Sequence, residues 1–309
     1  MAAAIITLTV LVALFFLFAY VGFHLAFRPF RHEVDDYRRI HTDPQMNEHK
    51  DRIFKLCDEI ASLPHEEVSI VSFDGYTLRG RYHEVKKGAP IVIQCHGYHG
   101  SPIRDFCGSS GMIRKAGLNI LLIEERAQHR SEGRAVTFGI LERFDVKSWC
   151  EYLTDRFGRV PIILMGVSMG ASTVLMASEL ELPENVKGVI ADCPYSSPIK
   201  ILLKVGDDQK MPRCIMKPLA HLSARIFGRF DIEEATPIDA VQNTKLPVML
   251  IHGTDDDFVP CEMSKDMKKV NPDIRLELFP GAHHVMSAII DSDRYERILN
   301  EFISDALGV

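Results

Sequence analysis

The 309-residue chain has little that points to nucleic acid, zinc or nucleotides. Its formal net charge is -6, so it lacks the basic excess of a nucleic-acid-binding protein. It has no long block of like charge, and neither a GxGxxG nor a Walker A motif. The seven cysteines are odd in number, scattered and without a CxxC pair, which argues against a zinc ribbon or disulfide scaffold and favours reduced thiols.

Charged side chains are also missing from the first apolar stretch. Residues 2–27 contain no Asp, Glu, Lys or Arg, and a helix needs about 20 apolar residues to cross a bilayer. One alternative is a cleaved signal peptide, which has a positive start, a shorter apolar run and a cleavage site between small residues. Another is a buried helix of a soluble protein. Because this run starts directly after Met1 and ends in bulky residues, we predict an uncleaved single-pass anchor over residues 1–27.

Basic residues lie on only one side of this predicted anchor. Arg28, Arg31, Arg38 and Arg39 follow it, and no Lys or Arg precedes it. The positive-inside rule therefore predicts a membrane protein whose C-terminal body lies in the cytoplasm, which agrees with the reduced cysteines. Residues 28–66 are predicted to form a connector, in which apolar residues at spacings of three and four indicate an amphipathic helix.

Residues 67–309 show alternating strand and helix patterns, which predict an α/β domain. A hairpin is expected around Asp74-Gly75. Counting both strands of the hairpin, eight segments have strand character: 68–72, 78–85, 91–95, 118–123, 162–165, 186–191, 248–251 and 274–279. Strands that alternate with helices form a mostly parallel sheet flanked by helices. Residues 195 to about 240 interrupt this rhythm and are predicted to be an inserted helical lid.

A candidate nucleophile lies between a predicted strand and a predicted helix. Gly166-Val167-Ser168-Met169-Gly170 matches G-x-S-x-G, and its context, after strand 162–165 and before helix 169–180, is the one this motif requires. Gly166 and Gly170 allow the strand and the helix to approach closely. The N-terminus of the helix then directs its free N–H groups at a developing oxyanion. The structural alternative is a tight turn in an unrelated α/β fold.

A serine nucleophile needs a general base and a carboxylate that orients the base. Two later strands are followed by such groups, in the order that this kind of site requires. Asp255-Asp256-Asp257 follows the strand 248–251, and His283-His284 follows the strand 274–279. Because sites in open α/β sheets form at the carboxyl ends of strands, these groups are expected to meet Ser168. The spacing alone leaves open which Asp and which His take part.

These motifs resemble the α/β-hydrolase superfamily, in particular bacterial membrane-anchored esterase/lipase-like and serine-aminopeptidase-like hydrolases. The resemblance covers about 68–307 and rests on segments 95–100, 166–170, 252–260 and 281–287. It implies the α/β-hydrolase fold and a triad of Ser168, Asp256 and His284. It also implies an oxyanion hole made by the backbone N–H groups of Tyr98 and Met169, with His96 and Gly97 shaping the turn.

A metal site is the alternative for His96 and His99. No third ligand is spaced to complete a zinc site, so we predict neither metal nor organic cofactor. The predicted function is hydrolysis of a carboxylic ester through an acyl-enzyme. The alternatives are a thioesterase or serine peptidase on the same triad, or a membrane-tethered binding protein without activity. The expected partners are a small-molecule or lipid acyl substrate and the membrane, but not nucleic acid.

The predicted lid is basic within an acidic chain. Between residues 197 and 230, apolar residues are interleaved with seven cations: Lys200, Lys204, Lys210, Arg213, Lys217, Arg225 and Arg229. The only acidic residues there are Asp207 and Asp208. Either the lid packs its apolar face on the core and leaves its cations in water, or its basic face meets anionic lipid headgroups.

Overall fold

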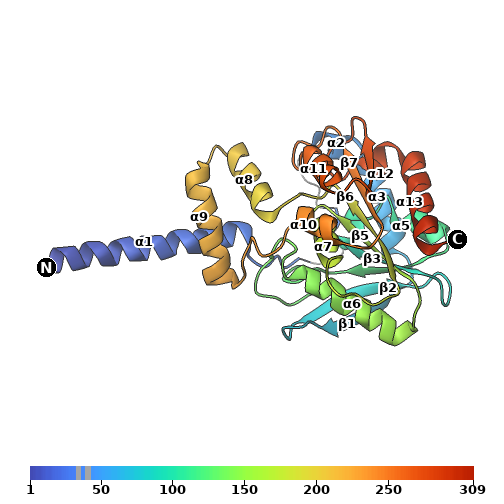
Figure 1. The fold of residues 1–309 in the computed structure, drawn as a ribbon, viewed down its shortest axis with the longest axis horizontal. Coiled ribbons are helices and arrows are strands. Elements are labelled where there is room, and N and C mark those ends of the chain that lie inside the picture. The colour runs from blue at the N-terminus through green and yellow to red at the C-terminus, as the bar shows by residue number, and fades with distance from the viewer. Residues whose placement is uncertain (33–35, 39–42) are drawn as a thin grey trace.

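Eight strands form one sheet in the order β1-β2-β4-β3-β5-β6-β7-β8 (Figure 1). They are β1 (Glu66–Val71), β2 (Thr77–His83), β3 (Ile91–Cys95), β4 (Asn119–Ile123), β5 (Ile162–Val167), β6 (Val186–Asp192), β7 (Val248–Gly253) and β8 (Arg275–Phe279). The pairs β1–β2 and β2–β4 are antiparallel, and all other neighbours are parallel. This computed structural model describes residues 1–32, 36–38 and 43–309, so Arg39 lies outside the described residues. The predicted eight-stranded, mostly parallel sheet is confirmed.

Helices cover both faces of the sheet. One apolar layer is contributed by α2 (Pro44–Glu48), α3 (Lys50–Ala61), α4 (Pro102–Asp105), α5 (Ser110–Lys115), α12 (Ser287–Ile290) and α13 (Ser292–Leu307). The other comes from α6 (Glu142–Phe157), α7 (Met169–Ala177), α10 (Pro237–Asn243) and α11 (Glu262–Val270). Successive residues of a strand point to opposite faces, so Val92 joins the first layer while Ile91 and Ile93 join the second. The connector helix α3 is thus part of the core.

The sequence pattern of residues 106–116 is helical, but only Ser110–Lys115 within it forms a helix, α5. Residues 106–109 form a turn that follows α4. The carboxylate of Asp105 turns back and accepts the Gly97 N–H at 2.9 Å. A Cβ at Gly108 would lie 2.7 Å from the Ala288 Cβ, so this turn approaches α12 more closely than a side chain allows. Tertiary contacts therefore outweigh the local helix pattern here.

The segment between β6 and β7 forms the helical insertion. It contains α8 (Pro198–Asp208), α9 (Arg213–Ser223) and the π-helical turn η1 (Ala224–Gly228), before α10 leads into β7. Most of its basic side chains are not free. Lys204 pairs with Asp208, Arg213 with Asp207, Lys217 with Glu233 and Arg225 with Asp231, at N–O distances of 2.5 to 3.3 Å. Asp231 and Glu233 lie just beyond the segment in which charges were counted, so the basic face is weaker than expected.

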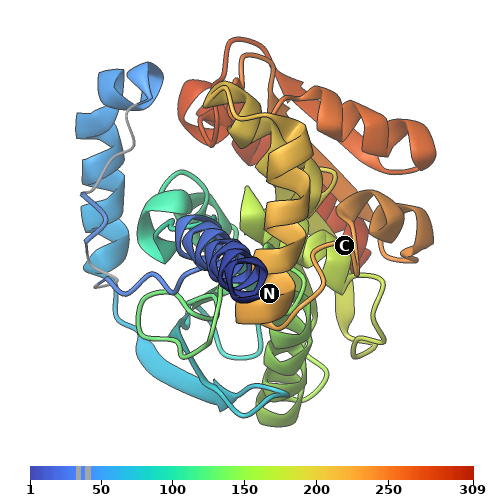
Figure 2. The same cartoon turned by 90° about the vertical axis from the view of Figure 1, so that its left-hand side faces the viewer.

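The N-terminal helix α1 (Ala2–Ala26) is 25 residues long, with a mean hydropathy of 2.7 over its most apolar window. By length and composition it can cross a membrane, a test that a signal sequence near an N-terminus also passes. Figures 1 and 2 show it projecting from the body with α9 beside its inner end. Its C-terminal end nevertheless joins the core, because Ala19 and Phe27 are completely buried. Burying a Phe side chain contributes about 1.5–3 kcal/mol, so a cut after residue 27 removes part of the apolar packing.

Candidate active site

Ser168 lies on a sharp turn between β5 and α7. Its backbone has φ 55° and ψ -115°, a strained conformation for a residue with a side chain. The Ser168 N–H donates to the Asp192 carbonyl at 2.8 Å. A Cβ at Gly166 would lie 2.2 Å from the Gly170 carbonyl oxygen, and one at Gly170 would lie 1.8 Å from the Cys95 carbonyl oxygen. Only glycine fits at these two positions, which explains the motif physically.

Asp256, His284 and Ser168 form a continuous hydrogen-bonded line. The His284 Nδ1 lies 2.7 Å from the Asp256 Oδ2, and the His284 Nε2 lies 2.9 Å from the Ser168 Oγ. With Nδ1–H donating to the carboxylate, Nε2 accepts the hydrogen bond from the serine hydroxyl. In this tautomer the unprotonated His284 Nε2 faces the serine hydroxyl and can take its proton.

The loop after β7 holds the Asp256 carboxylate in place. Its Oδ1 accepts the N–H groups of Phe258 at 3.1 Å and Val259 at 2.7 Å, and its Oδ2 lies 3.4 Å from the His252 Nε2. Burial opposes ionisation of Asp256, but the charge of His284 and the hydrogen bonds from His252 and His284 outweigh it and lower the carboxyl pKa. Asp256 therefore remains a carboxylate at neutral pH.

The neighbours of Asp256 and His284 make different contacts. The Asp255 carboxylate accepts the Thr254 hydroxyl at 2.7 Å, and the Asp257 carbonyl contacts Lys204. The His283 Nδ1 lies 2.9 Å from the Asp43 Oδ2, and this hydrogen bond raises the His283 pKa. In the run of three aspartates and in the histidine pair, the residue selected by the family resemblance is the one that belongs to the hydrogen-bonded line to Ser168.

The turn after β3 lies against the serine. A Cβ at Gly97 would lie 3.4 Å from the Ser168 Cβ, so the backbone leading into Tyr98 passes directly beside the candidate nucleophile. His96 is buried under this turn, with its Nδ1 2.8 Å from the Gly97 carbonyl oxygen and its Nε2 accepting the Glu125 N–H at 3.0 Å. Burial lowers the His96 pKa to about 3, so the ring is neutral. Because both ring nitrogens are engaged, a metal bound by His96 and His99 would have to break these hydrogen bonds.

Asp192 and Cys193 also lie near the triad. Sequence patterns did not single out either residue as functional. The Asp192 carboxyl is fully buried and accepts the Tyr295 hydroxyl at 3.0 Å, and burial raises its pKa to about 6. Cys193 follows it in a left-handed backbone conformation, with φ 49°. Asp192 could have been found from the sequence as an acidic residue at the end of β6, the strand beside β5, which leads into Ser168.

Among the described residues, Cys193, Asp256 and His284 are the one group spaced closely enough to hold a metal ion, with candidate ligand atoms within 4.8 Å of one another. Since Asp256 and His284 already bond to each other, a metal there would replace the hydrogen bond that orients the imidazole. A separate surface hollow of about 530 Å³ is lined by Arg38, Phe54, Asp58 and other connector residues, and by none of the triad.

Comparison with known proteins agrees with the fold of this chain. A family model described as the alpha/beta hydrolase fold matches residues 90–210, and the dienelactone hydrolase family model matches residues 215–297. The uncharacterised protein YqkD of Bacillus subtilis is 24% identical over 241 residues, which cover 76% of this chain and 78% of YqkD.

Solved structures show the same fold. The esterase Pf2001 of Pyrococcus furiosus superposes with a TM-score of 0.64 and 23% identity, covering 80% of this chain and 93% of the esterase. The acylaminoacyl peptidase of Pyrococcus horikoshii superposes with a TM-score of 0.56 and 17% identity, covering 79% of this chain and 42% of the peptidase. The chain has the α/β-hydrolase fold, and the matches to both family models support hydrolase activity.

Proposed function

We propose that the chain is a serine hydrolase that cleaves carboxylic esters through an acyl-enzyme. The observation that carries this proposal is the hydrogen-bonded line from Asp256 through His284 to Ser168, with contacts of 2.7 and 2.9 Å. A serine hydroxyl is a weak nucleophile until a base takes its proton, and this line supplies the base and its orienting carboxylate.

The mechanism uses groups of this chain and water. The Ser168 Oγ attacks the acyl carbonyl carbon while the His284 Nε2 takes the serine proton. The backbone N–H groups of Met169 and Tyr98 stabilise the resulting oxyanion. His284 then gives the proton to the leaving alkoxide oxygen, and the acyl group stays on Ser168. A water molecule, deprotonated by His284, attacks this ester, and His284 returns that proton to the departing Ser168 Oγ as the carboxylic acid is released. Ionised Asp256 stabilises the imidazolium in both halves.

The leaving group is proposed to be an alcohol. The lid is rich in apolar residues, and the sequence offers no distinct charged clamp for the amino terminus of a peptide. A thioester or peptide bond could be cleaved by the same triad, and a binding protein without activity would keep the fold. The likeness to both an esterase and a peptidase concerns the fold, so the substrate class rests on the lid composition.

A substrate panel tests this proposal. The full-length protein should hydrolyse p-nitrophenyl acyl esters, whereas aminoacyl anilides should react at least about tenfold more slowly in kcat/KM, a difference of about 1.4 kcal/mol. The Ser168→Ala variant should lose nearly all of this activity because it lacks the nucleophile. Its circular dichroism spectrum should match that of wild type, which shows that the variant is folded. Faster turnover of the anilides would replace the esterase assignment with a peptidase. Turnover near wild type in Ser168→Ala would remove Ser168 from the reaction.

We further propose that residues 1–27 anchor the protein in a membrane. Residues 28–66 connect this anchor to the hydrolase domain, which consists of residues 67–309 and includes the lid at about 195–240. The hydrolase domain faces the cytoplasm. The apolar length of α1 and the arginines that follow it support this arrangement. Retention of the uncleaved chain in membranes through a carbonate wash tests the anchor. Protection of the domain from protease added outside intact cells tests its orientation.

A further inference from the structure

The C-terminal end of α1 packs against the lid, where it contacts α9 and η1. The Ser223 hydroxyl at the end of α9 donates to the Ala19 carbonyl at 2.8 Å. A Cβ at Gly22 would lie 2.5 Å from the Ser223 Oγ, so the two helices touch with no room for a side chain. The Phe23 ring lies 6.0 Å from the Phe227 ring of η1, and the face of α1 that meets the lid is buried. Figure 2, which looks along α1, shows α9 lying across it.

The same end of α1 reaches the turn that lies against Ser168. The Tyr98 hydroxyl donates to the Ala26 carbonyl in the last turn of α1, at 3.0 Å. The Tyr98 ring stacks on Phe138 at a centroid distance of 5.1 Å, and Phe138 in turn packs edge-on against Phe27 at 5.8 Å. Burial raises the Tyr98 pKa to about 12, so the hydroxyl keeps the proton that it donates. The candidate oxyanion turn is thereby attached to the helix by a hydrogen bond and an aromatic stack.

The chain just after α1 continues this attachment. The Phe27 carbonyl accepts the Val136 N–H at 2.9 Å. The Phe30 backbone bonds to Ala127 at 2.7 Å and to His129 at 2.8 Å, and the His129 Nε2 lies 2.8 Å from the Gly100 carbonyl oxygen. Gly100 closes the turn that contains Gly97 and Tyr98, through its N–H to the Gly97 carbonyl at 3.0 Å. Two routes therefore connect the end of α1 to the same turn.

The position of these contacts along α1 places the turn relative to a bilayer. About 20 residues span the hydrocarbon core, so a span that begins at Ala2 reaches about Val21. The contacts with the lid begin at Ala19, at the edge of that span. Ala26 lies five residues beyond Val21, which is about 7 Å of helix and corresponds to the outer edge of the headgroup layer.

We propose that the last two turns of α1 are part of the active-site scaffold, with the Tyr98 hydroxyl as the positioning group. Through its bond to Ala26, this group sets the backbone N–H of Tyr98 against the oxyanion, and the anchor holds the site at headgroup level. The lid contacts at Ala19 and Gly22 lie near the end of the hydrocarbon span, where the ester bonds of acyl lipids also lie, so acyl lipids of the same leaflet are the substrate class. This inference rests on the proposed hydrolase function and on the proposed oxyanion role of Tyr98.

The test uses the full-length chain in nanodiscs and a water-soluble short-chain ester, so that access to lipid does not enter. Tyr98→Phe keeps the ring and its stack but loses the hydrogen bond to Ala26. We expect kcat to fall about tenfold with KM unchanged, because the oxyanion donor contributes in the transition state and not in substrate binding. Tyr152→Phe is the control. It loses a tyrosine hydroxyl contact of 2.8 Å with Arg156 on α6, away from α1 and the triad, and should stay within about twofold of wild type.

A second pair of variants acts on α1 itself. Gly22→Leu forces α1 away from Ser223 and should lower kcat on the same ester, whereas Ala13→Leu changes an exposed position of the same helix and should not. Thermal melting of each variant separates this effect from unfolding. In a second arm, wild type should hydrolyse an acyl-lipid ester in the same nanodisc faster than the same ester in a separate vesicle. Unchanged kcat in both Tyr98→Phe and Gly22→Leu, with Ser168→Ala inactive, would overturn the positioning role and leave the hydrolase function standing.

Discussion

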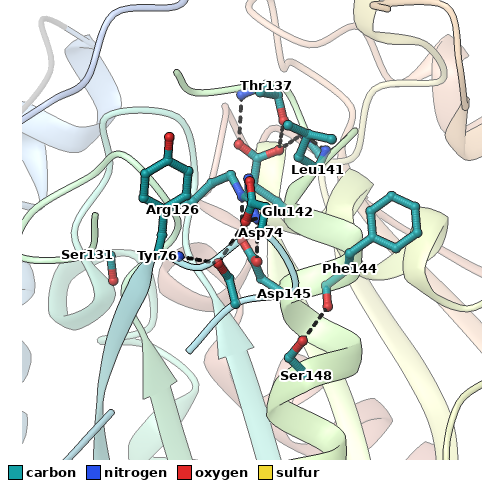
Figure 3. A network of polar contacts seen from close by, with 12 residues as sticks. Asp74, Tyr76, Arg126, Ser131, Thr137, Leu141, Glu142, Phe144, Asp145 and Ser148 are labelled. Atoms are coloured by element: carbon teal, nitrogen blue, oxygen red, sulfur yellow. Dashed lines mark hydrogen bonds and ion pairs between the residues drawn. The ribbon is translucent and has the colours of Figure 1, made fainter. Parts of the chain in front are cut away.

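Asp256 and Asp145 are both buried carboxylates, but they lie in regions built for different purposes. Asp256 has the ring of His284 as its partner, at 2.7 Å. Asp145, on α6, has the guanidinium of Arg126, with two contacts of 2.6 Å (Figure 3). Arg126 also bonds to Asp74 in the β1–β2 turn, at 3.0 and 3.1 Å, and its side chain is only 2% exposed. One pair faces a nucleophile, and the other joins the hairpin to α6.

The difference between the partners explains the difference in role. The arginine cannot give up its proton, so its five donors act as a fixed connector between elements. An imidazole can accept and release a proton at its ring nitrogen, so a proton can pass between His284 and Ser168. Burial raises the Asp145 pKa to about 7 despite Arg126, whereas hydrogen bonds and the charge of His284 overcome burial and lower the Asp256 pKa.

Substitutions in the triad should have the largest effect on activity. Asp256→Asn and His284→Ala should each lower kcat by about 10³-fold or more, because the imidazole loses its orientation or is absent. Steady-state kinetics on a p-nitrophenyl ester measures this. Asp255→Asn, Asp257→Asn and His283→Ala are the matched controls and should change kcat by less than about tenfold. A larger loss in a control than in its neighbour would reverse that assignment.

Substitution of Arg126 should change the stability of the protein and leave its activity nearly unchanged. Arg126→Met leaves the buried Asp145 carboxyl without its partner and should lower the free energy of unfolding by about 3–5 kcal/mol. Urea unfolding measures this. Arg156→Met, which removes a partly exposed bond to Glu66 of 2.6 Å, should cost less than about 1 kcal/mol. The kcat of the folded Arg126→Met protein should stay within about threefold of wild type. If Arg126→Met loses activity without losing stability, the claim that Arg126 is structural and the triad catalytic is wrong.

Local sequence patterns were sufficient for most of the sheet and for the location of the site. The strands could be predicted because their apolar runs are short and bounded by turn residues, as at Asp74-Gly75. Ser168 could be found because the strand-to-helix turn requires glycine on both sides. The candidate acid and histidine each follow a strand, but the choice of Asp256 among three aspartates and of His284 between two histidines needed the family resemblance.

Contacts between distant segments could not be predicted. Nothing in residues 19–27 indicates that Ala26 accepts the Tyr98 hydroxyl, since an apolar run looks the same in lipid and against a lid. The two ion pairs of Arg126, with Asp74 and with Asp145, join segments far apart in the chain, so no local pattern indicates them. The pairing of the lid cations was missed because Asp231 and Glu233 follow the segment that was counted.

The central claim is that Ser168 is the acylated nucleophile, and covalent labelling tests it most directly. A fluorophosphonate should phosphonylate the full-length protein once per chain, and peptide mass spectrometry should place the adduct on Ser168. The His284→Ala variant should label at least about 10²-fold more slowly, because the serine then lacks its base. No adduct on wild type, or an adduct on any residue other than Ser168, would contradict the account.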